Sequence, residues 1–168
     1  MWKILGKGEE NEWNRKGRDL LHMEKYPEAV ESFKKGLEED PKDVRGWVGK
    51  GMALAHLAQH REAIECFDHA IRLDPENPGA WYGKGISYSA IDQYENAILC
   101  FEKKIRFDPQ DHMGWLKKGE SLEAVENLRE ALDCYEHAFA MSRSRRIQEK
   151  RDDLLQFIKG KAREDESR

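Results

Sequence analysis

The sequence predicts an all-α protein built as a stack of helix pairs, and three observations support this fold class. The pattern of residues from Trp47 to Pro75 is repeated with a period of 34 residues, from Trp81 to Pro109. Within the pattern, apolar and small residues recur at spacings of three and four, along one face of a helix. Hydrophobic residues make up 39% of the chain and charged residues 37%, a mixture typical of amphipathic helices. A strict period of this length indicates an array of repeats.

Four tandem units account for most of the chain, residues 10–43, 44–77, 78–111 and 112–145, after a short N-terminal lead. In the third unit, Trp81 and Gly85 lie on the first helix, and Ala97 and Phe101 on the second. Large and small residues alternate, so the helices of a pair can interlock closely, and we expect the tryptophan to be a core residue. An Asp-Pro pair ends the second helix in three units, because proline lacks the amide donor.

The array is expected to end with the fourth unit, where Arg143 stands in place of the proline. Apolar residues then recur among charges, which predicts a capping helix over residues 146–160 that packs on the last repeat. Residues 161–168 are nearly all polar, and a disordered tail is expected there.

Residues 10–145 resemble the tetratricopeptide repeat family, because Trp, Gly, Ala, Phe or Tyr, Ala and Pro recur together at one unbroken period. The resemblance implies a right-handed superhelical solenoid of antiparallel helix pairs. It also implies that the first helices line a concave groove, which binds a peptide or an amphipathic helix of a partner protein.

Lysines depart from the family pattern at two kinds of position. The family usually has leucine just before the repeated glycine, where this chain has Lys16, Lys50, Lys84 and Lys118. We expect their stems to lie over the helix junction with the ammonium groups in water, although a functional ladder of cations is an alternative. Lys104 replaces the small residue found as Ala70 and Ala138, and is expected to loosen the seam between repeats three and four or to extend out of it.

The groove residues are predicted from a second stripe on the first helix of each repeat, about 100° from the packing stripe. The middle of this stripe is small and apolar and its ends are polar, which suits an apolar or amphipathic segment. An alternative is that Met52 and Ile86 only fill gaps between repeats. The predicted site comprises Asn14, Arg15, Arg18, Arg45, Val48, Gly49, Met52, Tyr82, Gly83, Ile86, Leu116 and Lys117.

The family's chaperone adaptors hold a peptide C-terminus with a clamp of lysine, asparagine and arginine, and this clamp is not expected here. The corresponding positions hold Asn14, Arg18, Gly49, Gly79 and Gly83.

No pattern of catalytic or metal-binding residues emerges. Cys66, Cys100 and Cys134 recur at the repeat period, but equivalent helices lie about 8–10 Å apart, too far for shared zinc ligation or disulfides. Small buried thiols are therefore expected. The glycine-rich segment 46–51 lacks the Gly-Lys-Ser/Thr ending of a phosphate loop. We expect a protein that is not an enzyme and has no cofactor or metal.

The net charge of −4 gives no general attraction to nucleic acid, and the basic run after Ser142 is diluted by carboxylates. No stretch approaches the ~20 apolar residues of a membrane span, and the apolar run at the N-terminus is too short for a secretory signal. The expectation is a cytoplasmic scaffold that binds a protein or peptide and no nucleic acid or membrane, as a monomer or weak homodimer. A self-assembling structural module is the alternative, and an RNA-associated protein is less favoured.

Overall fold

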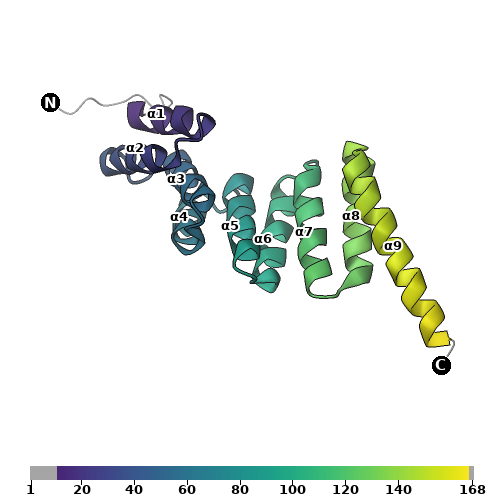
Figure 1. Cartoon of the computed structure of the whole chain (residues 1–168). Coiled ribbons are helices and arrows are strands. Elements are labelled where there is room, and N and C mark those ends of the chain that lie inside the picture. The colour runs from purple at the N-terminus through teal and green to yellow at the C-terminus, as the bar shows by residue number, and fades with distance from the viewer. Residues whose placement is uncertain (1–10, 167–168) are drawn as a thin grey trace. The chain divides into compact units, whose positions relative to one another are not determined.

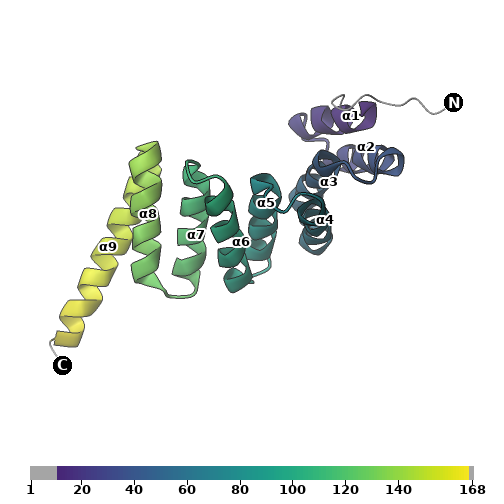
Figure 2. The ribbon, with the colours of Figure 1, turned by 180° about the vertical axis from the view of Figure 1, so that it is seen from behind.

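The computed structural model describes residues 11–166, and within this range all regular secondary structure is α-helical (Figures 1 and 2). The predicted all-α class is therefore confirmed. The helices are α1 (Glu12–His22), α2 (Tyr26–Glu39), α3 (Val44–His56), α4 (His60–Leu73), α5 (Pro78–Ala90), α6 (Tyr94–Phe107), α7 (His112–Ala124), α8 (Leu128–Ser142) and α9 (Arg145–Glu166).

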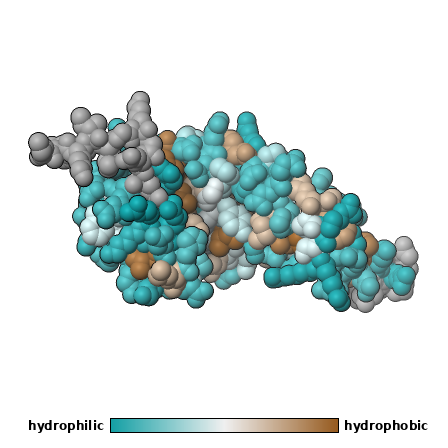
Figure 3. Space-filling model, turned by 90° about the horizontal axis from the view of Figure 1, so that it is seen from above, coloured by the Kyte–Doolittle hydropathy of each residue, from teal (hydrophilic) through white to brown (hydrophobic). Residues whose placement is uncertain are grey.

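The helices belong to two compact units, whose boundary lies inside α5 between Gly83 and Lys84. In the first unit, α2 packs on both α1 and α3, and α3 also packs on α4. In the second, α7 packs on both α6 and α8, and α8 on α9. The face of the molecule seen in Figure 3 is mostly hydrophilic, with hydrophobic residues in small groups, as amphipathic helices require.

In the first unit, the core is built on contacts between aromatic rings and glycines. Phe33 of α2 lies between Gly17 of α1 and Gly49 of α3, and a Cβ at Gly49 would come within 2.4 Å of the Phe33 ring. One repeat later, Phe67 is fully buried, and a Cβ at Gly83 would come within 2.3 Å of its ring. Glycine is required because no other residue lets the backbone approach so closely. Each ring therefore joins its own helix to the first helices on either side.

The second unit retains half of this arrangement. Phe101 contacts Gly85, and Tyr135 contacts Gly119. Lys117, however, occupies the position that Gly49 and Gly83 hold in earlier repeats. The contact of a ring with a glycine in the first helix of the next repeat is therefore a feature of the first unit.

Tryptophan side chains link the first turns of α3 and α5 to the turn that precedes each helix. The indole N–H of Trp47 donates to the Pro41 carbonyl at 2.9 Å, and that of Trp81 to the Pro75 carbonyl at 2.8 Å. Trp47 is half-buried and stacks on the exposed His69, with ring centroids 4.3 Å apart. Both tryptophans are half-buried, and Trp47 packs at the edge of the core cluster around Phe67, because the indole N–H groups reach carbonyls of the preceding turns.

Each turn within a helix pair contains a residue with left-handed backbone geometry. These residues recur every 34 positions and none is glycine: Glu24, Ala58, Asp92 and Glu126, with φ between 57° and 59°. The turn closes in the same way each time, since the amide after each of these residues donates to a carbonyl near the end of the preceding helix, as Gln59 does to Leu54 at 2.9 Å.

The last helix is longer than the sequence analysis expects. The capping helix was expected over residues 146–160, whereas α9 extends from Arg145 to Glu166. Helix α9 thus includes residues 161–166, where Lys, Ala, Arg and Glu are strong helix formers. Residues 167–168 and the N-terminal lead lie outside the described residues.

Replacing Gly83 with alanine tests the contact between this glycine and Phe67. We expect Gly83→Ala to lower the free energy of unfolding by about 1–3 kcal/mol, because the fully buried ring has no space to move away. Gly79 on the same helix is the matched control, since a Cβ there meets only the Asn77 side chain, at 3.4 Å. Urea unfolding of both variants gives the comparison. Equal midpoints for the two would show that the ring does not depend on the glycine.

Candidate functional site

A hollow of about 540 Å³ lies in the first unit between α1 and α3, and we call it the α1–α3 hollow. It brings together half of the predicted groove residues. The lining comprises Asn14, Arg18, Leu21, His22, Phe33, Arg45, Val48, Gly49, Met52, His56 and Asn77.

The floor of the α1–α3 hollow is apolar. Met52 is 45% exposed although it is a large hydrophobic residue, and Val48 one turn earlier is half-buried. Gly49 carries no side chain, so the Phe33 ring beneath it also contributes to the lining. Methionine is flexible and polarisable, so this floor can adapt to apolar side chains of different shapes.

The rim of the α1–α3 hollow carries basic and imidazole groups. Arg18 and His22 come from α1, and Arg45 and His56 from α3. His56 is held by stacking on Tyr26, with ring centroids 4.4 Å apart and planes nearly parallel. No carboxylate belongs to the described lining, so the rim favours an anionic ligand.

Asn14 is a buried residue of this lining, and a hydrogen bond fixes the orientation of its amide. Its side chain is buried, and its Nδ2 donates to the Asp43 carboxylate at 2.7 Å. Because a carboxylate accepts only from the amide nitrogen, this bond fixes which end of the amide is oxygen. The Asn14 Oδ1 atom has no hydrogen-bond partner within the described residues. The same Asp43 accepts from the Arg45 amide at 2.9 Å and so caps α3.

Arg15, Tyr82 and Gly83 do not line the α1–α3 hollow. Arg15 lies in a separate hollow with Trp13 and Asp19. It directly follows Asn14 in α1, and successive side chains of a helix point about 100° apart. Tyr82 is half-buried on α5, and Gly83 contacts Phe67.

The remaining predicted groove residues belong to the second unit. Leu116 was expected to face a partner, but it is only 8% exposed and lies in a core cluster with Leu122 and Tyr135. Ile86 is half-buried. The Lys117 ammonium pairs with Glu120 at 2.7 Å.

Phe33 and Asn77 line the α1–α3 hollow although neither belongs to the predicted stripe on the first helices. The signal for Phe33 was Gly49, whose missing side chain lets the ring contact the α3 backbone at this hollow. Asn77 precedes α5, and its Oδ1 accepts from the Ala80 amide at 3.0 Å. The capping role of Asn77 can be inferred from the sequence. The location of Asn77 at the edge of a hollow formed by α1 and α3 cannot be inferred in this way.

The repeated lysines lie over neighbouring aromatic rings or pair with a carboxylate. The Lys50 ammonium is 5.5 Å from the centre of the Trp47 ring, and that of Lys84 is 5.5 Å from the Tyr88 ring. Lys118 instead pairs with Glu102 at 2.8 Å. These contacts favour a packing role over a ladder of cations that faces a ligand.

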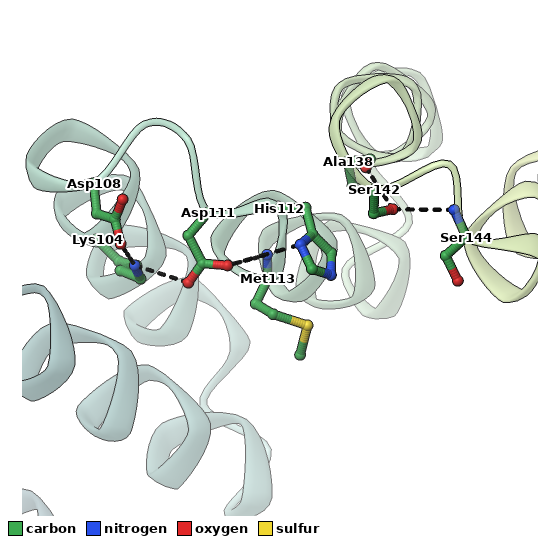
Figure 4. A network of polar contacts seen from close by, with 8 residues as sticks. All are labelled: Lys104, Asp108, Asp111, His112, Met113, Ala138, Ser142 and Ser144. Carbon is green, nitrogen blue, oxygen red and sulfur yellow. Dashed lines mark hydrogen bonds and ion pairs between the residues drawn. The ribbon is translucent and has the colours of Figure 1, made fainter.

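Lys104 is buried and ion-paired (Figure 4). Its ammonium pairs with Asp108 and lies 2.9 Å from the Asp111 carboxylate. Asp111 also accepts from the Met113 amide at 3.0 Å, so Lys104 ties the end of α6 to the cap of α7. The lysine neither loosens this seam nor extends out of it, because two carboxylates of the intervening turn hold its charge.

These contacts set the protonation of the network. Burial lowers the pKa of Lys104, but its hydrogen bonds to Asp108 and Asp111 outweigh burial, and the pKa is raised overall. Burial likewise raises the pKa of Asp111, but the bonds from Lys104 and from the Met113 amide bring it below its ordinary value. Both shifts favour the charged pair at neutral pH.

The three cysteines are buried, as expected, and none of them forms a disulfide within the described residues. Burial raises the pKa of both Cys66 and Cys134 to about 11, so they are protonated at neutral pH. No three His, Cys, Asp or Glu side chains within residues 11–166 gather where they can hold a metal ion. No helix in this range combines the length and apolar character that crossing a membrane requires.

Models of one known family match residues 14–98 of this chain. Three models described as tetratricopeptide repeat match residues 14–60, 44–77 and 66–98. No curated protein sequence matches the chain.

Solved structures match most of the chain. MamA 41-end from Desulfovibrio magneticus RS-1 superposes with a TM-score of 0.76 at 18% identity, covering 93% of this chain and 94% of that one. TTC0263, a thermophilic TPR protein in Thermus thermophilus, gives 0.73 at 18%, covering 87% and 81%. YrrB, described as a TPR protein with an unusual peptide-binding site, gives 0.74 at 18%, covering 88% and 76%. These likenesses establish the fold, and the predicted solenoid class is confirmed.

Replacing Lys104 with methionine tests the buried ion pair. At pH 7 we expect Lys104→Met to lower the free energy of unfolding by about 1–3 kcal/mol, less than for a fully buried pair because the two carboxylates are partly exposed. The raised pKa of Lys104 contributes stability that is complete below about pH 10 and lost as pH rises further. The lowered pKa of Asp111 contributes stability that is present above about pH 4 and lost as pH falls.

The free energy of unfolding should therefore differ strongly between wild type and Lys104→Met at pH 7 and only slightly near pH 3. Urea unfolding at both pH values measures this difference. Lys103→Met is the control, because Lys103 is exposed on the same helix. An equal difference in unfolding free energy at both pH values would show that the Asp108 and Asp111 carboxylates do not stabilise the fold through Lys104.

Proposed function

Because this chain belongs to the tetratricopeptide repeat family, whose members are scaffolds for protein–protein interaction, we propose that it is a non-enzymatic scaffold that holds a segment of a partner protein in the α1–α3 hollow. The proposed site comprises Asn14, Arg18, Arg45, Val48, Gly49 and Met52, with the other lining residues around them. Tyr82, Gly83, Ile86 and Lys117 stay predictions from the sequence and are not part of this proposed site.

The observation that carries this proposal is the combination of an exposed apolar floor with a rim that lacks carboxylates. Met52 offers apolar surface for an anchoring side chain, and burying such a side chain stabilises a complex by about 1.5–3 kcal/mol. Arg18 and Arg45 can form charge-assisted hydrogen bonds to carboxylates. The proposed ligand is therefore a peptide or amphipathic helix with an apolar residue flanked by Asp or Glu.

The description of YrrB as having an unusual peptide-binding site agrees with a peptide ligand on this fold. The chaperone-type clamp is not part of the proposal, since glycines occupy three of its positions.

Nucleic acid is a less favoured ligand because nearby carboxylates neutralise the basic residues near the start of α9. Arg145 pairs with Glu149 at 2.9 Å, and Arg151 with Asp152 at 2.6 Å. Neighbouring carboxylates weaken attraction to phosphates.

Selection of peptides from a random displayed library on the immobilised protein tests the proposal. We expect the selected peptides to combine an apolar residue with Asp or Glu. Their affinity, measured by fluorescence anisotropy, should fall by about tenfold or more in Arg18→Glu/Arg45→Glu, because each lost charge-assisted bond costs on the order of one factor of ten.

Arg15→Glu is the matched control, since Arg15 lies on the same helix as Arg18 but lines a different hollow. It should leave the affinity unchanged. Selection of basic peptides, or full binding by the Arg18→Glu/Arg45→Glu variant, would refute the assignment of the ligand to the α1–α3 hollow.

A further inference from the structure

The C-terminal half of α9 presents an exposed stripe that consists of Asp153, Phe157 and Lys161. The three residues are spaced by four and so share one face of the helix. Phe157 is 52% exposed, and the Lys161 ammonium lies 4.9 Å from the centre of its ring. Ile147 and Leu154 are buried against the second unit, and Leu154 lies close to Lys161 around the helix, so the α9 stripe adjoins the face of α9 that already packs.

This α9 stripe borders a hollow of about 520 Å³ in the second unit. Leu128, Glu123 and Glu126 line the opposite side, near the connection between α7 and α8. Figures 1 and 2 both show the end of α9 lying apart from that connection. Phe157 therefore lies at the rim of this hollow, which the buried Leu154 also lines.

The α9 stripe is complementary in charge to a second copy of the same stripe. If two copies of α9 pack antiparallel about a two-fold axis at Phe157, each residue before Phe157 faces the residue equally far after it on the other copy. Asp153 of each copy then faces Lys161 of the other, and the two rings meet at the axis. A two-fold interface requires this self-complementarity. Gly160 leaves the surface beside the ring open, since a Cβ there meets nothing within 4 Å.

We propose that the α9 stripe is a homodimer interface, in which α9 packs antiparallel on α9 of a second copy. The pattern of an apolar ring with opposite charges four residues to either side selects another α9. The acidic residues around it disfavour an anionic lipid surface. A single helix face buries less than the ~1,200 Å² of a standard interface, so the dimer is weak and forms at high protein concentration. It involves none of the residues of the α1–α3 hollow.

Charge reversal followed by sedimentation equilibrium tests this arrangement. Wild type should show a concentration-dependent dimer. Asp153→Lys places two lysines opposite each other, and Lys161→Asp places two aspartates opposite each other, so each variant should dimerise about tenfold or more weakly. The double variant Asp153→Lys/Lys161→Asp should recover dimerisation, and an equimolar mixture of the two single variants should form heterodimers.

Phe157→Glu should remain monomeric, and Lys159→Asp, exposed on another face of α9, is the matched control that should still dimerise. Circular dichroism should show equal helix content in all variants, because every substituted residue is exposed. A wild type that stays monomeric at all concentrations would overturn the proposal, as would a dimer that persists in Phe157→Glu. Failure of the two single variants to pair with each other would also overturn it.

Discussion

The structure of the first unit depends on the contact between an aromatic ring of one helix and the glycine backbones of two others. Phe33 and Phe67 each occupy such a place, and each is almost or fully buried. The contact brings three helices together at once, so it sets both the pairing within a repeat and the stacking between repeats. At Gly49 the same contact places the buried Phe33 ring next to the α1–α3 hollow, so a packing residue also contributes to its lining.

The α1–α3 hollow combines packing with charge. Val48 and Met52 form its floor because α3 packs on α2 and α4 with other faces, leaving this one uncovered. The arginines at its rim add positive charge, and no carboxylate belongs to the described lining. Apolar and cationic groups thus converge in one place, where a peptide with matching groups can contact both.

The sequence predicted what local periodicity controls: the helix pairs, the buried cysteines and six residues of the hollow. It failed where a side chain's surroundings come from residues far away in the sequence. Leu116 occupies the same repeat position as the half-buried Val48, yet the cluster around Leu122 and Tyr135 buries it. Lys104 looked like a disruption because its two carboxylate partners lie in a turn whose geometry periodicity does not describe.

The distribution of glycine has a consequence for how the chain acquires its structure. Every glycine that the structure describes lies within a helix, whereas residues other than glycine occupy the four left-handed turn positions. Each helical glycine disfavours an isolated helix by roughly 1 kcal/mol relative to alanine, and α3 alone has three. Such a helix is unstable until the rings of its neighbours pack against it. Folding of each repeat is therefore coupled to that of the next, and the array gains order cooperatively from neighbour to neighbour.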